Sequence, residues 1–375
     1  MAARPATLVM AAVLRGEPVA WPHGAEPAAF LDLAGAHGVQ PLLAHRLHGR
    51  ASETSWPDEV CEPLKAAARQ EAVAEVVRRR ELRRALAHLD AAGVGSLLMK
   101  GAALAYVSYP HPALRPRCDA DLLVRRDDGA TAIRVLQDLG YRRWTQTPGD
   151  LVMPQCTLVK DDPSGVAHAC DLHTKIANPA VFSDLLSFDE AAARAVAVPA
   201  LGGSARALGP FDALIVACIH RVAHHHDSDR LLWLYDIHLL ASAMDRPALE
   251  RFAALAAEKR VRAVAARGLT LARQWLATDV PDATLEALAA GDSAEPSAAF
   301  VGGPLSQVAV LRSDLGALAG WPARWRLLRQ HLFPPPDYMR ARYEVSGSAL
   351  LPALYALRAL RGVRHWLRRP SGVSS

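Results

Sequence analysis

The amino-acid sequence predicts an α+β protein, in which a small mixed-sheet core lies between N-terminal helices and a large C-terminal helical region. Three observations support this fold class. Residues 58–92 carry one continuous helical pattern, residues 94–175 alternate between short apolar runs and helical patterns, and nearly all of the chain after Pro210 is helical in pattern. The chain has 375 residues, of which 51% are hydrophobic and 22% charged, so it can bury a sizeable core.

The N-terminal part, residues 1–93, is expected to be helical. Glycine and proline divide residues 1–56 into short helices. From Asp58 to Ala92 the sequence is rich in alanine, with Arg and Glu on one side of the helix and Val, Leu and Ala on the other. Gly93 follows and is expected to end this helix.

The middle part, residues 94–208, is predicted to form the mixed α/β core. The run from Asp119 to Val124 alternates polar and apolar residues and then turns fully apolar, as a strand does on entering a core. The expected elements, in chain order, are strand 96–99, helix 102–107, strand 119–124, helix 128–139 and strands 141–144, 155–160 and 166–173.

The C-terminal part, residues 209–375, is expected to consist of helices. Its last segment, from Ala349 to Arg369, is basic and amphipathic. Such a helix can contact RNA, a membrane surface or a partner protein, although a solvated helix face is the commoner explanation. The expected helices are 211–225, 229–242, 247–258, 261–276, 306–318, 322–332 and 348–368.

Net charge, cysteine content and hydropathy limit the binding partners and the cellular compartment that the sequence allows. A net charge of +5 would help to attract a nucleotide or RNA without requiring one. The five cysteines are scattered and form no Cys-x-x-Cys pair, which argues against a disulfide framework or a zinc site and favours the cytoplasm. No apolar run approaches the roughly 18–20 residues that a membrane span needs, so we expect no span.

Three aspartates on two predicted strands are the candidate catalytic residues and metal ligands. Side chains two apart in a strand point to the same face, so Asp119 and Asp121 are placed to hold Mg²⁺ or Mn²⁺, which prefer oxygen ligands. Asp171 lies in an apolar strand pattern, where an unpaired carboxylate is costly to bury, and a neighbouring strand would bring it beside the other two. The plainer alternative for each is a solvated or turn-capping aspartate.

Nearby basic residues are candidates for nucleotide binding. Lys100-Gly101 lies where a strand meets a helix, so the glycine permits close approach of a ligand, the helix N-terminus favours phosphate and the lysine adds positive charge. Arg115 and Arg117 flank the carboxylates and are suited to grip phosphate through paired hydrogen bonds. The alternatives are a tight turn with an exposed lysine, and arginines that pair with the acidic cluster.

Three runs of this sequence carry a family resemblance. They are LMKGAAL at 98–104, RPRCDADLLV at 115–124 and CDLH at 170–173. Together they resemble the uncharacterised bacterial nucleotidyltransferase family, which belongs to the DNA polymerase β-like superfamily. The similarity continues to His220, to 231–236 and to 333–343, and covers most of residues 30–360 at motif level. One departure is Cys118, which stands where a Gly or Ser commonly precedes the first aspartate.

The resemblance implies a polymerase β-like core that carries out two-metal nucleotidyl transfer. By this resemblance Asp119 and Asp121 are metal ligands, and Asp171 is the third ligand and a candidate base for the acceptor hydroxyl. Lys100 and Gly101 contact the triphosphate. The implied co-substrate is a nucleoside triphosphate such as ATP, and the acceptor is a small molecule, a peptide or protein, or a tRNA.

A histidine-rich helix is the second conspicuous cluster. His220 and His224 are four residues apart and share a helix face, a spacing that can bind metal. The pair His226-Asp227 is similar to the His-Asp pair of HD-type phosphohydrolases. Structural histidines at the junction of two parts of the chain are the favoured interpretation.

The helix that follows the histidines carries further candidates. His220 and Arg230 are expected to line the nucleotide cleft from the helical side. Trp233 is expected in the core. Asp236 is expected to be buried and to form a hydrogen bond, with Arg230 as the candidate partner.

Three functions remain open on these residues. The favoured one is a metal-dependent nucleotidyltransferase that moves a nucleoside monophosphate from a nucleoside triphosphate (NTP) to a hydroxyl. The second is a catalytically degenerate protein that binds a nucleotide or a partner, against which the intact set of three carboxylates argues. The third is an HD-like metal phosphohydrolase centred on His226-Asp227.

Overall fold

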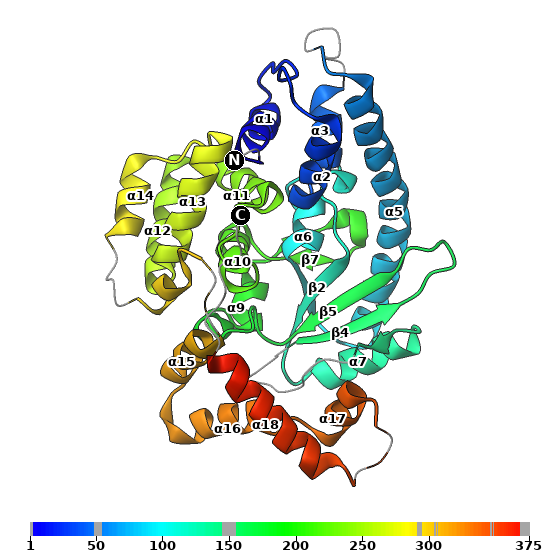
Figure 1. Cartoon of the computed structure of the whole chain (residues 1–375), viewed down its shortest axis with the longest axis vertical. Coiled ribbons are helices and arrows are strands. Elements are labelled where there is room, and N and C mark those ends of the chain that lie inside the picture. The colour runs from blue at the N-terminus through cyan, green and yellow to red at the C-terminus, as the bar shows by residue number, and fades with distance from the viewer. Residues whose placement is uncertain are drawn as a thin grey trace.

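The computed structural model describes residues 3–48, 55–144, 155–290, 295–303, 305, 307–345, 347 and 349–367. As the sequence predicts, the fold is α+β, with a seven-stranded mixed sheet flanked by helices (Figure 1). The order of the strands in the sheet is β3-β4-β5-β2-β1-β7-β6. Their bounds are β1 (Ser96–Met99), β2 (Asp119–Val124), β3 (Arg142–Arg143), β4 (Gln155–Lys160), β5 (His168–His173), β6 (Val196–Ala197) and β7 (Arg206–Ala207).

The centre of the sheet brings two of the predicted carboxylates together. β2 runs parallel to β5, and Asp121 lies opposite Asp171 in the register. β2 also pairs antiparallel with β1, where Asp121 lies opposite Met99. The next residue, Lys100, begins helix α6 (Lys100–Val107), so the lysine enters the structure beside the same carboxylate.

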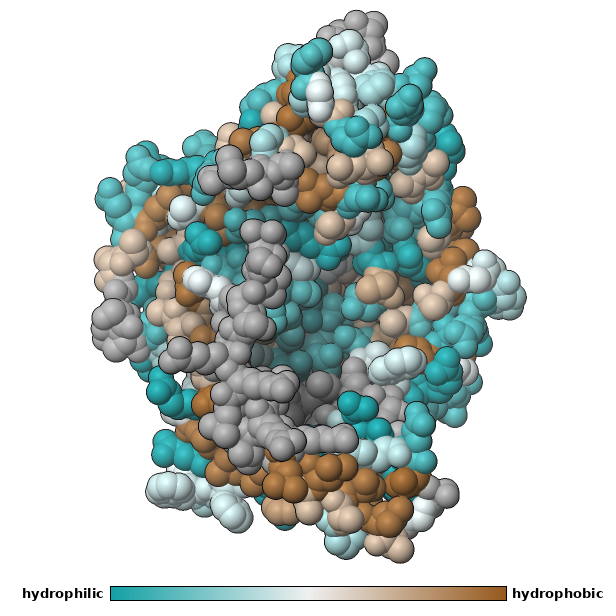
Figure 2. All heavy atoms as spheres, in the orientation of Figure 1, coloured by the Kyte–Doolittle hydropathy of each residue, from teal (hydrophilic) through white to brown (hydrophobic). Residues whose placement is uncertain are grey.

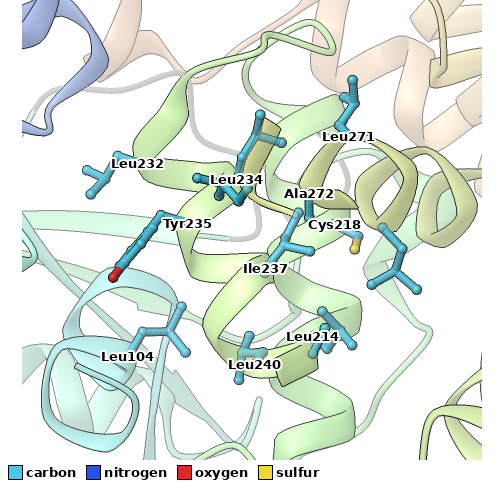
Figure 3. Packing of buried hydrophobic residues seen from close by; sticks show 14 of the residues in the cluster. Leu104, Leu214, Cys218, Leu232, Leu234, Tyr235, Ile237, Leu240, Leu271 and Ala272 are labelled. Atoms are coloured by element: carbon cyan, nitrogen blue, oxygen red, sulfur yellow. The ribbon is translucent and has the colours of Figure 1, made fainter. Parts of the chain in front are cut away.

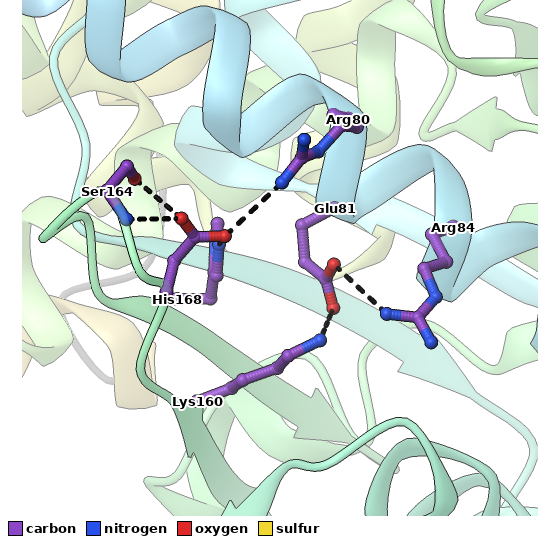
Figure 4. A network of polar contacts seen from close by, with 7 residues as sticks. Arg80, Glu81, Arg84, Lys160, Ser164 and His168 are labelled. Carbon is purple, nitrogen blue, oxygen red and sulfur yellow. Dashed lines mark hydrogen bonds and ion pairs between the residues drawn. The ribbon is translucent and has the colours of Figure 1, made fainter.

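A single long helix, α5 (Asp58–Ala91), runs along the sheet (Figure 1). Salt bridges fasten it to the strand β4 and to the turn that follows. Lys160 lies 2.6 Å from Glu81, and Arg80 lies 3.5 Å from Asp162 (Figure 4). The other helices of the first half are α1 (Ala3–Arg15), α2 (Pro27–His37), α3 (Gln40–Leu47) and α7 (Gly129–Asp138).

The sheet separates two hydrophobic clusters. Leu97 and Leu123 belong to one cluster, and their strand neighbours Leu98 and Leu122 belong to the other, because successive side chains of a strand point to opposite faces. The first cluster joins the sheet to the helices α1–α3 and to the C-terminal helices. The second joins it to α5 and α7.

The C-terminal helices form a compact bundle beside the sheet. Figure 3 shows its buried side chains, with Leu214 and Cys218 of α10 near Ile237 of α11. A Cβ atom on Gly268 of α13 would lie 2.7 Å from the Cys218 Sγ atom, so glycine is needed for this close helix contact. The helices are α10 (Pro210–Ala223), α11 (Leu231–Ser242), α12 (Arg246–Glu258), α13 (Arg262–Leu276) and α14 (Asp282–Ala289).

Four more helices lie at the lower edge of the molecule in Figure 1. They are α15 (Gln307–Ala317), α16 (Gly320–Leu332), α17 (Pro336–Tyr343) and α18 (Leu351–Leu367). Arg368 and Arg369 of the predicted basic segment lie outside the described residues, as do the side chains of Arg361 and Arg364. Over the part of the chain that the structure describes, no helix combines the length and apolarity needed to cross a membrane.

The shortest elements differ most from the prediction. The strand expected at 141–144 spans only Arg142–Arg143, and the sequence did not predict β6, β7 or α17. The short helices α8 (Ala180–Ser183) and α9 (Phe188–Ala193) and the helix α14 were also missed. A two-residue strand shows no periodicity, so its position depends on long-range pairing rather than on local pattern.

Candidate active site

One cleft lies between the sheet and the helices α10 and α11, and its volume is about 580 Å³. Figure 2 shows it as a hydrophilic hollow in the middle of the face that is drawn. The fold brings all nine residues proposed from the sequence to this one cleft. They are Lys100, Gly101, Arg115, Arg117, Asp119, Asp121, Asp171, His220 and Arg230.

A group that can hold a metal ion lies on the floor of the cleft. It consists of Asp121, Asp171 and His173, whose ligand atoms all lie within 4.8 Å of one another. The parallel pairing of β2 and β5 explains the group, because it sets Asp121 beside Asp171. His173 follows two residues later on β5 and therefore points to the same face of the sheet.

Asp121 is buried and held in its charged form. Its Oδ1 atom accepts a hydrogen bond from the Lys100 ammonium at 2.6 Å and lies 2.8 Å from the His173 Nε2 atom. Burial alone would raise the pKa of this carboxyl, but the charge of Lys100 and the contact with His173 outweigh burial and hold the pKa well below its usual range. Asp121 is thus negatively charged across the ordinary pH range.

Asp171 is positioned by the neighbouring strand β4. The Thr157 hydroxyl donates a hydrogen bond to its Oδ1 atom, and the Gln155 amide donates to Oδ2 at 3.4 Å. Both donors are neutral, so they orient the carboxylate without neutralising its charge. The carboxylate itself lines the cleft.

Asp119 differs from the other two aspartates. It is not in the three-residue group above, yet burial, and then the charges of Asp121 and Asp171, raise its pKa from 3.8 to about 6. Ionising Asp119 is therefore costly, first because the carboxyl is buried and then because two other carboxylates lie nearby.

This shift in the pKa of Asp119 leads to a stability prediction. In the unfolded chain the carboxyl ionises near 3.8, whereas in the folded protein it keeps its proton to about 6. The free energy of unfolding of the metal-free protein therefore falls as the pH rises from about 4 to 6. Above that range the contribution of Asp119 to this decrease is complete. Asp119→Asn should raise the free energy of unfolding at pH 8 by about 3 kcal/mol, and should change it little at pH 4.

Urea unfolding of the metal-free wild type and variant at both pH values measures this difference. Saturating Mn²⁺ should abolish the advantage of Asp119→Asn, because the cation relieves the repulsion that the substitution removes. A variant that is less stable than the wild type at pH 8 without metal would contradict the prediction.

Lys100 and Gly101 lie at the start of α6. Lys100 has a positive φ of 49°, which is unusual for a residue with a side chain, and this backbone directs its ammonium to Asp121. A Cβ atom on Gly101 would lie 3.0 Å from the guanidinium of Arg115, so glycine lets that arginine pack flat against the helix. This close approach supplies a structural reason for the glycine in addition to the predicted one.

Arg115 and Arg117 line the cleft but are bound to carboxylates outside the aspartate cluster. Arg115 forms a two-pronged salt bridge with Asp236 of α11, in which Nη2 lies 2.7 Å from Oδ2 and Nε lies 2.9 Å from Oδ1. Arg117 lies 2.7 Å from Glu75 of α5. Asp236 therefore pairs with Arg115, and the expectation that its partner is Arg230 is wrong. These two arginines thus join the segment that precedes β2 to helices on both sides of the cleft.

Arg230 instead lies over an aromatic ring. Its guanidinium carbon is 4.9 Å from the centre of the Trp233 ring, and the His225 ring stacks on the same tryptophan at 3.7 Å. Trp233 is buried, as the sequence predicts, but it also contributes to the wall of the cleft.

The histidines of α10 and the following turn form the wall of the cleft that faces the helical region. His220 and His225 approach each other with their Nε2 atoms 3.1 Å apart. Burial, and then the charge of Lys100, lower the pKa of His224 to about 3 and hold that of His220 well below its usual range. Both rings are therefore neutral at neutral pH.

The pair His226-Asp227 does not line the cleft. Asp227 is buried in a structural network, where it pairs with Arg221 and Arg267 and accepts a hydrogen bond from the Gly302 amide. Asp227 thus stabilises the packing of α10 against α13 by pairing with an arginine from each helix. This geometry disfavours the HD-like phosphohydrolase.

His173 is the site residue that the sequence analysis missed. It was quoted only as part of the CDLH run, although its spacing from Asp171 places both side chains on one face of the strand. The spacing of two that indicates Asp119 and Asp121 therefore also indicates Asp171 and His173.

The mixed α+β fold, with its carboxylate-lined cleft, is consistent with a nucleotidyltransferase core. The model of the family described as uncharacterised nucleotidyltransferase matches residues 23–277. The chain belongs to this family, which confirms the resemblance found in the motifs. No curated protein matches the chain.

Proposed function

We propose that this protein is a metal-dependent nucleotidyltransferase that moves a nucleoside monophosphate from an NTP to a hydroxyl acceptor. The observation that carries the proposal is the pairing of Asp121 with Asp171, beside His173, on the floor of a polar cleft. Family membership supports the same chemistry. The acceptor classes to be tested are a small molecule, a peptide or protein, and a tRNA.

The residues of the site fit a divalent cation such as Mg²⁺ or Mn²⁺. Asp121 and Asp171 supply oxygen donors of the kind that hard cations prefer, and Asp119 supplies a third carboxylate, whose pKa is raised first by burial and then by its two acidic neighbours. The bound cation would stabilise negative charge on the transferring phosphoryl group.

The remaining groups of the cleft have roles toward the substrates. Lys100 would contact the triphosphate, and Arg115 and Arg117, together with His220 and Arg230, would shape the nucleotide site. Asp171 would accept the proton of the acceptor hydroxyl as the acceptor oxygen bonds to the α-phosphorus. The bond from that phosphorus to the bridging oxygen breaks at the same time, and pyrophosphate leaves.

A catalytically degenerate binding protein is the alternative. It would need the cleft but not three carboxylates gathered in it, because a cluster of buried carboxylates reduces stability through desolvation and mutual repulsion. The three carboxylates therefore favour the enzyme over a binding module.

The test is transfer of label from each α-labelled NTP, with Mg²⁺ or Mn²⁺, to components of a lysate from the protein's own host. The control is the Asp119→Ala/Asp121→Ala variant. Label that appears on a small molecule, protein or RNA only with the wild type supports the proposal and identifies the acceptor class. Absence of both transfer and metal-dependent NTP binding would refute it.

A second prediction concerns Lys100. Its ammonium donates a hydrogen bond to Asp121 Oδ1, and a cation bound to that oxygen would have to compete with it. Lys100→Met should tighten Mn²⁺ binding roughly tenfold, since the metal no longer competes with the lysine, and should destabilise the metal-free protein. Titration followed by electron paramagnetic resonance measures the affinity, and Lys100→Arg is the charge-conserving control. Weaker Mn²⁺ binding by Lys100→Met would show that the lysine supports the metal instead of displacing it.

A further inference from the structure

The lower edge of the molecule exposes large apolar side chains that the nucleotidyltransferase site does not use. Figure 2 shows hydrophobic residues gathered there, over the region of α16–α18. Trp321 is 77% exposed and Trp325 is 67% exposed. The other large exposed apolar residues of this region are Leu332, Phe333, Leu350, Leu357 and Leu360. We call these seven residues the apolar edge.

Helix α16 presents one continuous apolar stripe to solvent. Trp321, Trp325 and Leu332 are four and seven residues apart, which places them on a single face. Leu327 lies on the opposite face and is fully buried, so the helix already has its inner packing. The exposed stripe is therefore additional to what the fold requires.

Arginines border this stripe. At 3.6 residues per turn, Arg324 and Arg329 fall on either side of it. The guanidinium carbon of Arg324 lies 5.9 Å from the centre of the Trp321 ring, which confirms that the two side chains are neighbours. An apolar stripe with tryptophan and flanking arginines has the composition of a helix that lies in a membrane interface.

The charge of the whole chain is concentrated in the same region. Residues 315–375 contain ten arginines and only two acidic residues, Asp337 and Glu344. Since the net charge of the chain is +5, the remaining residues are more acidic than basic. The net positive charge of the chain thus comes from residues 315–375.

Contacts with the rest of the protein hold the apolar edge in place. The Tyr355 hydroxyl of α18 donates a hydrogen bond to the Pro334 carbonyl at 2.5 Å, which ties α18 to the segment after α16. Asp314 of α15 accepts a hydrogen bond from the Ala180 amide at 2.7 Å, which links the region to the main body. The edge is a built surface of the folded chain.

We propose that the apolar edge docks this protein on a membrane surface that carries anionic lipid headgroups. Tryptophan suits the boundary between headgroups and acyl chains, leucine suits the acyl chains, and arginine suits anionic headgroups. A second copy of the chain fits less well, because a symmetric contact would bring the two arginine-rich regions together. Nucleic acid also fits less well: the tryptophan rings offer a place for bases to stack, but the four exposed leucines add apolar surface that bases and phosphates would not cover. This inference is independent of the proposed function.

The experiment uses the full-length protein and vesicles of phosphatidylcholine, with or without phosphatidylglycerol. The wild type should sediment with the anionic vesicles, and much less with neutral vesicles or at high salt. Trp321→Ser/Trp325→Ser should weaken this binding at least roughly tenfold. The matched control is Val73→Ser/Val76→Ser on α5, which removes two exposed apolar residues close to other arginines and should leave binding unchanged.

Three results would overturn the proposal. The wild type could fail to sediment with anionic vesicles, or the tryptophan variant could bind them as the wild type does. Alternatively, the tryptophan variant could lose dimers in light scattering, or lose single-stranded RNA binding, with no change in vesicle binding. Circular dichroism of each variant verifies that the fold is retained.

Discussion

Asp171→Asn is expected to lower nucleotidyl transfer about a hundred- to ten-thousandfold and to leave the fold intact. Asparagine keeps an oxygen that can accept the hydrogen bond from Thr157, so the strand pairing is preserved. It loses the negative charge needed to hold a cation with Asp121, and it cannot accept the proton of the acceptor hydroxyl. Label transfer per unit time, with the acceptor found in the lysate assay, measures the effect.

The matched control for this substitution is Asp161→Asn. Asp161 lies ten residues earlier, is exposed and pairs with Arg142 on the surface. Its loss should leave transfer within about twofold of the wild type, because an exposed ion pair contributes little. Equal activity of Asp171→Asn and the wild type would remove Asp171 from the catalytic set.

Asp236→Leu is expected to lower the free energy of unfolding by about 3–5 kcal/mol, the largest stability effect that we predict. The substitution leaves the Arg115 guanidinium buried without its partner and removes the acceptor of the Tyr109 hydroxyl, which donates to Asp236 at 2.7 Å. Urea unfolding of the purified variant measures the loss.

Two further variants test whether the stability loss comes from the buried Arg115–Asp236 salt bridge or would follow the loss of any ion pair. Asp282→Ala breaks an exposed pair with Arg273 and should cost less than about 1 kcal/mol. Arg115→Met combined with Asp236→Leu should recover part of the loss, because no unpaired charge then remains buried. If Asp236→Leu costs no more than Asp282→Ala, then Arg115 is not held by this salt bridge.

The order of the main elements could be predicted from the sequence because it depends on local pattern. The 34-residue helix α5 carries a long amphipathic repeat, and β2 alternates before it turns apolar. The carboxylate pair of β2 could be found for the same reason, since a spacing of two in a strand is a local geometric fact.

The partners of the arginines could not be predicted in this way. Arg115 and Asp236 are 121 residues apart, and the rest of α5, the strand β1 and the helix α6 lie between Glu75 and Arg117 in the chain. Local spacing says nothing about such pairs, because the packing of α11 and α5 against the sheet determines them. The expectation that Asp236 pairs with nearby Arg230 failed because it used distance along the chain as a guide to distance in space.

The most direct test of the metal–nucleotide site is the anomalous-scattering map of a crystal soaked with Mn²⁺ and a non-hydrolysable NTP analogue. We expect manganese beside the carboxylates of Asp121 and Asp171, and the triphosphate within reach of Lys100, which will have left Asp121. Manganese bound only by the histidines of α10, or a nucleotide bound away from the cleft, would contradict the proposed function.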